Sequence, residues 1–206
     1  MNYKYLCLIF GITLNACSRM LRNMLKLTVR HLRFHPLARI KFPSIEKMQT
    51  FALMINNQEL LIDDVIGFMD GISLATECTS EKLTQNAFYS RYECDTVTNN
   101  VFAYGPDGKV FVAAINCPGS WADGALTARF LAHINTHISS YKICVNQGFL
   151  RSGDAYGTLV GPVTKCAARR LHHDVQDYYL RLSNIHTLFR QASTWGMRGL
   201  QGTFPR

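Results

Sequence analysis

A single carboxylate inside a long apolar segment is the feature that most restricts the fold of this 206-residue chain. Asp70 lies in Gly67-Phe-Met-Asp-Gly71, and the apolar run Ile72-Ser-Leu-Ala75 follows it directly. This apolar stretch predicts a strand over residues 65–76 that enters and leaves Asp70. A carboxylate at the head of a segment that must be buried is a typical first ligand of a site for hard metal ions.

The composition indicates a globular chain with a basic surplus. Hydrophobic residues make up 48% and charged residues 17%, which favours a folded chain with a sizeable core. There are 22 Lys and Arg against 14 Asp and Glu, so the net charge is +8 and the pI about 9.2. This balance favours a polyanionic partner, with nucleic acid ranked first and a membrane surface second.

The seven cysteines are scattered along the chain and contain no Cys-x-x-Cys pair, which argues against a zinc finger. Their odd number and wide spacing also argue against the disulfide framework of a secreted protein. Reduced thiols are typical of the nucleus or the cytosol, and we expect a nuclear protein.

The N-terminal residues predict two helices, over 3–10 and about 14–33, joined by a turn that contains glycine. The second helix is amphipathic and basic. Two interpretations remain open: a helix-turn-helix with its second helix in a DNA groove, and a plain helical hairpin with a solvated basic face. In the first interpretation the residues directed toward the groove are Asn15, Ser18, Arg19 and Arg22.

The same N-terminal residues also resemble a secretion signal, because an apolar stretch precedes Leu14-Asn-Ala-Cys17. The apolar stretch is too short, and it carries only one early Lys, so we expect no secretion. No apolar run reaches the length of a membrane span, and we expect no membrane partner.

A connector with prolines at 36 and 43 precedes Ser44-Ile-Glu-Lys47, which resembles a capping box and predicts a helix through about Asn56. The chain is therefore divided into a partial helix-turn-helix region, a connecting helix with linker, and a main domain. Their ranges are 1–45, 46–64 and 65–206.

The main domain is predicted to contain three strands, a helix, a fourth strand and further helices. The expected ranges are strands over 65–76, 98–105, 109–117 and 141–145, and helices over 121–138, 163–182 and 186–201. Gly105-Pro-Asp-Gly108 is a strong turn signal between the second and third strands. Ser183-Asn184 is expected to separate the last two helices, and Tyr178, Tyr179 and Trp195 are expected in the core. This order predicts an α/β domain of the ribonuclease H type, with a mixed sheet flanked by helices.

Five segments of this domain carry a resemblance to a known family. They are Gly67-Phe-Met-Asp-Gly71, Asn99-Asn-Val-Phe-Ala-Tyr-Gly-Pro-Asp-Gly-Lys109, Pro118-Gly-Ser-Trp-Ala-Asp123, Val145-Asn-Gln-Gly-Phe149 and Arg190-Gln-Ala-Ser-Thr-Trp-Gly-Met-Arg198. Together and in this order they resemble the DDE-superfamily endonuclease of PIF/Harbinger transposons, the group that includes the Harbinger-derived nuclease proteins. The resemblance covers about residues 65–206. It implies that the chain begins within the family's helix-turn-helix region and is truncated at its C-terminus.

The resemblance implies a metal-dependent endonuclease that uses Mg²⁺ or Mn²⁺ held by four acidic residues. The first falls on Asp70 and the second on Asp123, which are the candidate catalytic and metal-binding residues, although the family's preceding His is Ala122 here. The third and fourth fall on Asn146 and Thr194, which carry no charge. Two carboxylates bring −2 where four would bring −4, so we expect weak metal binding and impaired catalysis.

Each of these residues also has an interpretation without a metal. Asp70 is then a strand-end carboxylate, and Asp123 the N-cap of a helix that starts near Gly124. Asn146 is then a turn residue and Thr194 an ordinary helix residue.

The candidate contacts to DNA phosphates are basic residues of the N-terminal helix and of the late helices. They are Arg19, Arg22, Lys165, Arg169, Arg170, Arg190 and Arg198. A solvated surface is the alternative for each of them, and His172-His173 lacks the further ligands of a zinc site. The expected function is a DDE-type DNA endonuclease or transposase-like protein with impaired catalysis. The alternative is a non-catalytic DNA-binding protein derived from a transposase. The expected partners are DNA and a separate DNA-binding accessory protein.

Overall fold

A computed structural model describes residues 3–203 apart from 139, 152–154 and 156. The chain forms two compact units, with the boundary between Ile40 and Lys41. Each unit is described by itself.

The first unit is a pair of helices, α1 (Tyr3–Phe10) and α2 (Leu14–Leu32), as predicted from the sequence. Gly11 takes a left-handed conformation in the turn between them, with φ +60°. Thr13 is the N-cap of α2, where its side-chain oxygen accepts a hydrogen bond from the Ala16 N–H at 3.3 Å. Cys17 of α2 is buried, and its thiol lies near that of Cys7 in α1.

The second unit is built on a six-stranded mixed sheet. Its strands are β1 (Val65–Ala75), β2 (Tyr89–Ser90), β3 (Asp95–Tyr104), β4 (Val110–Pro118), β5 (Lys142–Cys144) and β6 (Leu159–Val160). The strand order is β2-β3-β1-β5-β6, and β4 also pairs with β3. β1 runs antiparallel to β3 and parallel to β5, which in turn is parallel to β6. This sheet and its helices confirm the predicted α/β class.

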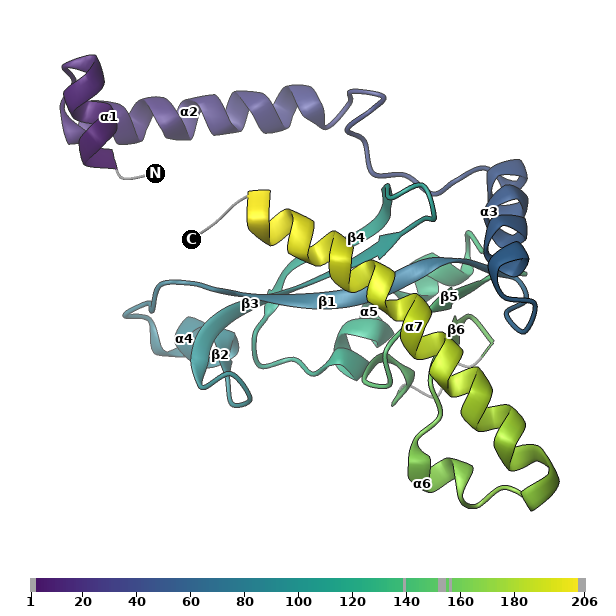
Figure 1. The fold of residues 1–206 in the computed structure, drawn as a ribbon. Coiled ribbons are helices and arrows are strands. Elements are labelled where there is room, and N and C mark those ends of the chain that lie inside the picture. The colour runs from purple at the N-terminus through teal and green to yellow at the C-terminus, as the bar shows by residue number, and fades with distance from the viewer. Residues whose placement is uncertain (1–2, 139, 152–154, 156, 204–206) are drawn as a thin grey trace. The chain divides into compact units, whose positions relative to one another are not determined.

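The helices of the second unit cover both faces of the sheet, with α7 crossing one face and α5 on the other (Figure 1). The helices are α3 (Ile45–Gln58), α4 (Lys82–Phe88), α5 (Asp123–Asn135), α6 (Lys165–Ala168) and α7 (His173–Thr203), with a 3₁₀ turn at Phe149–Arg151. Among the described residues, none of the helices combines the length and the apolar character needed to cross a membrane.

The two faces of β1 lie in two different hydrophobic clusters. Met69 packs in the cluster that contains Ile134 of α5, whereas Phe68 packs in the one that contains Ile185 of α7. The Phe68 ring also stacks on that of Phe189 in α7, with centroids 5.9 Å apart. Because alternate residues of a strand share a face, Asp70 lies on the α7 side of the sheet, as Phe68 does.

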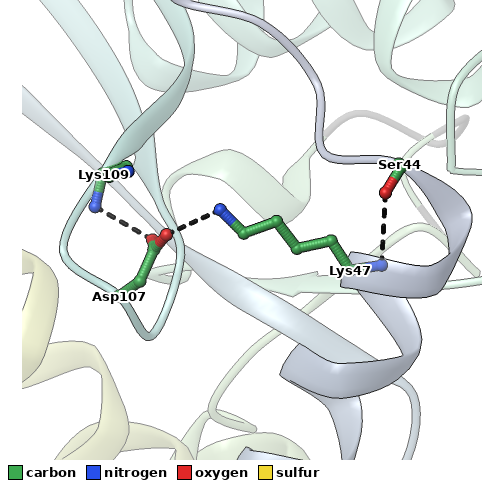
Figure 2. A network of polar contacts seen from close by, with 4 residues as sticks. All are labelled: Ser44, Lys47, Asp107 and Lys109. Carbon is green, nitrogen blue, oxygen red and sulfur yellow. Dashed lines mark hydrogen bonds and ion pairs between the residues drawn. The ribbon is translucent and has the colours of Figure 1, made fainter. Parts of the chain in front are cut away.

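The predicted hairpin and the predicted start of α3 meet at one polar network (Figure 2). Ser44 caps α3 by accepting a hydrogen bond from the Lys47 N–H at 3.4 Å, and the Lys47 ammonium lies 2.8 Å from Asp107 Oδ2 in the β3–β4 turn. Burial would raise the pKa of Asp107, but the hydrogen bonds from Lys47 and the Lys109 N–H, with their charges, hold it below its ordinary value. The network therefore joins α3 to the hairpin turn.

One prediction for the C-terminal helices is wrong. Ser183-Asn184 does not separate two helices, because α7 continues through both residues. The Ser183 hydroxyl donates to the Val163 carbonyl at 3.2 Å, so it does not compete for the backbone of its own helix. The interruption falls earlier, between the short α6 and the start of α7 at His173.

Candidate functional site

Asp70 lies on the central strand β1, opposite Phe102 of β3, and is half-buried. Its Oδ1 atom accepts a hydrogen bond from the Gly71 N–H at 3.0 Å. Its other side-chain hydrogen bonds come from the segment after β5 and from α7.

Asn146 reaches Asp70 because β5 lies parallel to β1, so both strands point toward the same end of the sheet. Its Nδ2 atom donates to Asp70 Oδ1 at 3.4 Å. Its Oδ1 atom accepts the Gly148 N–H at 2.8 Å. The amide thus bridges the Asp70 carboxylate and the loop that follows β5.

Thr194 reaches Asp70 from α7, because this helix packs on the sheet against β1. Its hydroxyl donates to Asp70 Oδ2 at 3.3 Å. Each carboxylate oxygen of Asp70 therefore accepts a hydrogen bond from a neutral side chain, although the three residues are far apart in the sequence.

Asp123 is the first residue of α5 and is half-buried. The interpretation of Asp123 as an N-cap is wrong, because the N-cap is Ala122 and no side-chain cap bond is made there. A Cβ atom added to Gly148 would collide with the Asp123 carboxylate and would lie 3.0 Å from Asn146 Oδ1. The Asp123 carboxylate therefore lies beside Asn146, and the positive end of the α5 dipole favours its charge.

We refer to Asp70, Asp123, Asn146 and Thr194 as the Asp70 cluster. All four are half-buried, and they come from β1, the start of α5, the loop after β5 and α7. The structure thus brings together the four positions that the sequence singled out.

Tyr104 lies near the Asp70 cluster, and the sequence did not predict it as a site residue. Burial first, and the negative charge of Asp70 second, raise the pKa of Tyr104 above its ordinary value. Its hydroxyl donates to Met197 Sδ at 3.5 Å, and a Cβ atom on Gly196 would lie 3.1 Å from its ring. The alternation of strand residues was the available signal, because Phe102 pairs with Asp70 and Tyr104 shares its face.

The donor set of the cluster does not fit a two-metal centre. Within the described part of the chain, no three or more His, Cys, Asp or Glu residues are grouped so as to hold a metal ion. Asn146 and Thr194 both direct hydrogen-bond donors at Asp70, where a hard dication requires oxygen acceptors. Chemically, the cluster is a carboxylate satisfied by neutral donors, with a second carboxylate beside it.

A groove of about 610 Å³ opens next to the cluster. It is bounded by Asp123, the loop 146–148, the segment 162–164 and α7. The polar side chains that α7 contributes are Ser183, Asn184 and Thr187. The lining is thus rich in neutral hydrogen-bonding groups, with Asp123 as its charged member.

The candidate DNA contacts belong to both units of the chain. Arg19 and Arg22 are exposed on α2, where they line a hollow of about 540 Å³ with Asn15, Ser18 and Lys26. Arg169 and Arg170 are exposed between α6 and α7, and Arg198 is exposed on α7. The side chains of Lys165 and Arg190 lie outside the described residues.

Two further predictions concern α7 and the residues before it. His172 Nδ1 lies 3.1 Å from Asp174 Oδ2, between side chains that are both 79% exposed. The expectation that Tyr178 and Tyr179 lie in the core is wrong, since they are 49% and 37% exposed and stack on each other edge to face. The side chain of Trp195 lies outside the described residues.

Comparisons of the chain with protein-family models, with curated proteins and with solved structures each found no match. Its function must therefore be inferred from the geometry and chemistry of the site.

Proposed function

We propose that this protein is a nuclease-like member of the PIF/Harbinger group of DDE endonucleases, with an RNase H-like domain and impaired catalysis. The observation that carries the proposal is the convergence of Asp70, Asp123, Asn146 and Thr194 into one cluster. The meeting in space of four positions selected by resemblance to one family supports the extension of that resemblance to the fold.

The sheet topology supports the same proposal. Three antiparallel strands, β4, β3 and β1, are continued by the parallel strands β5 and β6, with α5 between β4 and β5 in the chain. The first candidate ligand lies on the central strand, and the third lies just after the strand beside it. This arrangement is what an RNase H-like nuclease requires to collect carboxylates at one end of its sheet.

Impaired catalysis follows from charge and hydrogen bonding. Cleavage of a phosphodiester by two metals requires ligands that hold both dications and balance their charge. Here Asp70 is already satisfied by Asn146 and Thr194, and an amide and a hydroxyl contribute no negative charge. Loss of an oriented dication removes several kcal/mol of transition-state stabilisation, which is a rate loss of about a thousandfold or more.

A calorimetric titration of the protein with Mn²⁺ tests this proposal, together with nicking of plasmid DNA. We expect zero or one weakly bound Mn²⁺ and little nicking. The double variant Asn146→Asp with Thr194→Glu should bind Mn²⁺ more tightly. Robust nicking by the wild type that Asp70→Ala abolishes would contradict impaired catalysis. An unchanged Mn²⁺ affinity in a folded double variant would contradict the assignment of the site.

A second candidate function is DNA binding without catalysis, and the distribution of charge favours it. The first 40 residues contain seven Lys and Arg and no Asp or Glu, whereas residues 41–206 contain 15 basic and 14 acidic residues. The first unit therefore carries +7 of the net charge of +8. A folded unit of this charge attracts phosphates and releases their counterions.

Duplex binding measured over a range of salt concentrations tests this second function. We expect the association constant to fall steeply with salt, and the slope to become shallower by about one unit for each phosphate contact removed, in Arg19→Gln and Arg22→Gln. The same substitution at Arg169, Arg170 or Arg198 reports whether the second unit contributes. Binding that is absent, or independent of salt, would exclude this function. A nuclear location and a DNA-binding accessory protein belong to the same proposal.

A further inference from the structure

The first unit exposes an unusual amount of apolar surface. α1 is apolar on all sides apart from Lys4, and none of its described residues is buried. Leu6 is half-buried, and the other large apolar side chains are exposed, at 52% for Tyr3, 66% for Tyr5, 79% for Leu8, 71% for Ile9 and 67% for Phe10. A helix that is apolar all round normally requires an apolar environment.

α2 adds a second apolar surface, which lies opposite a basic one. At 100° per residue, its basic residues fall on one side of the helix and its large apolar residues on the other. The basic side consists of Arg19, Arg22, Lys26 and Arg30. The apolar side includes Met20, Met24, Leu25, Leu27 and Leu32, which are between 48% and 65% exposed.

Basic and apolar side chains meet along one border of α2. A hollow of about 640 Å³ there is lined by Leu25, Val29 and Phe34 together with Arg22, Lys26 and Arg30. Long basic side chains beside apolar ones can extend their charged ends past an apolar layer into water. The surface of α2 is thus amphipathic, with basic and apolar side chains on adjacent sides, as binding at a membrane interface requires.

From these observations we infer that α1 and α2 bind the surface of an anionic lipid bilayer. The apolar sides of the two helices enter the boundary between headgroups and acyl chains, and the basic side faces the anionic headgroups. The helices lie in the plane of the interface and do not span it, since no described helix is suited to crossing a membrane.

Charge complementarity and shape favour an anionic bilayer over a second copy of the chain, a DNA duplex or an acidic protein. A second copy would bring a second unit with seven basic and no acidic residues against the first, and the two would repel. A duplex satisfies the basic side and leaves the apolar sides in water. A groove in an acidic protein covers one stripe of one helix, whereas α1 is apolar on all sides.

This inference goes beyond the proposed function, because it uses the apolar sides of the first unit, which DNA binding leaves uncovered. It also departs from the expectations based on the sequence, which ranked nucleic acid above a membrane surface and gave no membrane partner. Composition alone does not show that the basic and the apolar side chains of the first unit lie on different surfaces.

Flotation of the full-length protein with vesicles tests the inference. Vesicles of phosphatidylcholine with phosphatidylserine are compared with vesicles of phosphatidylcholine alone. We expect binding to the first to exceed binding to the second by tenfold or more, since each basic residue near an anionic surface contributes about a fivefold gain.

Matched substitutions of exposed leucines separate the apolar contribution. Leu8→Gln with Leu25→Gln should lower partitioning into the anionic vesicles by about tenfold or more for each leucine removed. The control is Leu60→Gln with Leu83→Gln in the second unit, at leucines that are 77% and 79% exposed, and it should bind as the wild type does.

Four outcomes would overturn the inference. The first is equal binding to neutral and anionic vesicles, and the second is an equal loss of vesicle binding in the two double variants. The third is binding to a DNA duplex without binding to either kind of vesicle. The fourth is a dimer in sedimentation that binds no vesicles and that dissociates in the double variant Leu8→Gln with Leu25→Gln. None of these outcomes depends on the Mn²⁺ titration that tests the nuclease-like site.

Discussion

Asn146 Nδ2 donates a hydrogen bond to Asp70 Oδ1 at 3.4 Å, so a neutral donor faces this carboxylate in the candidate site. The resemblance to DDE endonucleases assigns an acidic residue to position 146. A carboxylate there would face Asp70 as a like charge and would require a cation between them. The Asn146 amide requires no such cation, because it is neutral and donates a hydrogen bond to Asp70.

The first prediction concerns this pair. Without metal, Asn146→Asp should lower the free energy of unfolding by about 1–2 kcal/mol, because it exchanges a hydrogen bond for like-charge repulsion. Added Mn²⁺ should recover the loss, seen as a rise in Tm. Asn184→Asp is the matched control, since it adds the same charge at an exposed position of the adjoining groove. The same response to Mn²⁺ in both variants would contradict the assignment.

The second prediction uses the packing of Gly148 against Asp123. Gly148→Ala should lower the free energy of unfolding by about 1–3 kcal/mol, because the added Cβ atom must displace the carboxylate of Asp123. Chemical denaturation of the two single variants and of the double variant Gly148→Ala with Asp123→Ala gives the coupling between the sites. We expect the cost to be largely relieved when Asp123 is already Ala. Additive costs would show that the two residues do not touch.

The third prediction is a loss of stability in mild acid caused by His186. Burial lowers the pKa of His186 below its ordinary 6.5, with a hydrogen bond to Gly161 opposing the shift, and the Nδ1 atom has no partner among the described residues. The unfolded chain then binds the proton more readily than the folded one. The contribution of His186 is therefore present above about pH 6.5 and is lost as the pH falls through the folded pKa.

Urea denaturation at a series of pH values measures this effect. The slope assigned to one histidine is at most about 1.4 kcal/mol per pH unit. It should disappear in His186→Leu and persist in the control His173→Gln, which changes an exposed histidine. An unaltered slope in His186→Leu would assign the acid sensitivity to other groups.

The fourth prediction concerns the coupling of Tyr104 to Asp70. Asp70→Asn should lower the pKa of Tyr104 toward its ordinary value of 10, but not fully, because burial is the larger cause of the shift. The difference between ultraviolet titrations of matched proteins with and without Tyr104→Phe isolates this tyrosine. Because the folded pKa is raised, Tyr104 stabilises the fold below pH 10, and that contribution is lost as the pH rises through the folded value.

Much of the secondary structure was predictable because its signals are local. The apolar stretch around Asp70, the Gly105–Gly108 turn and the Ser44 cap each depend on a few neighbouring residues, and the structure contains the strand, the turn and the cap. The short strands β2 and β6 and the helix α4 were missed. Strands of two residues have no periodicity of their own and exist only through their pairing with β3 and β5.

The continuity of α7 shows where local rules fail. Ser183 and Asn184 are weak helix formers, and the sequence therefore suggested a break. In the fold, the Ser183 hydroxyl finds the Val163 carbonyl, which lies in a different segment. Ile185 is buried in the cluster that contains Phe68, so packing on the sheet outweighs the local preference.

The sequence by itself determined which four positions belong to the candidate site and how much charge they carry. It also determined that nearly all of the basic surplus lies in the first 40 residues. Only the tertiary structure decided that Asn146 and Thr194 direct their donors at Asp70. Those contacts span 76 and 124 positions of the chain. They form because β5 pairs with β1 and α7 packs across the sheet, and no local pattern of residues encodes the distance between such elements.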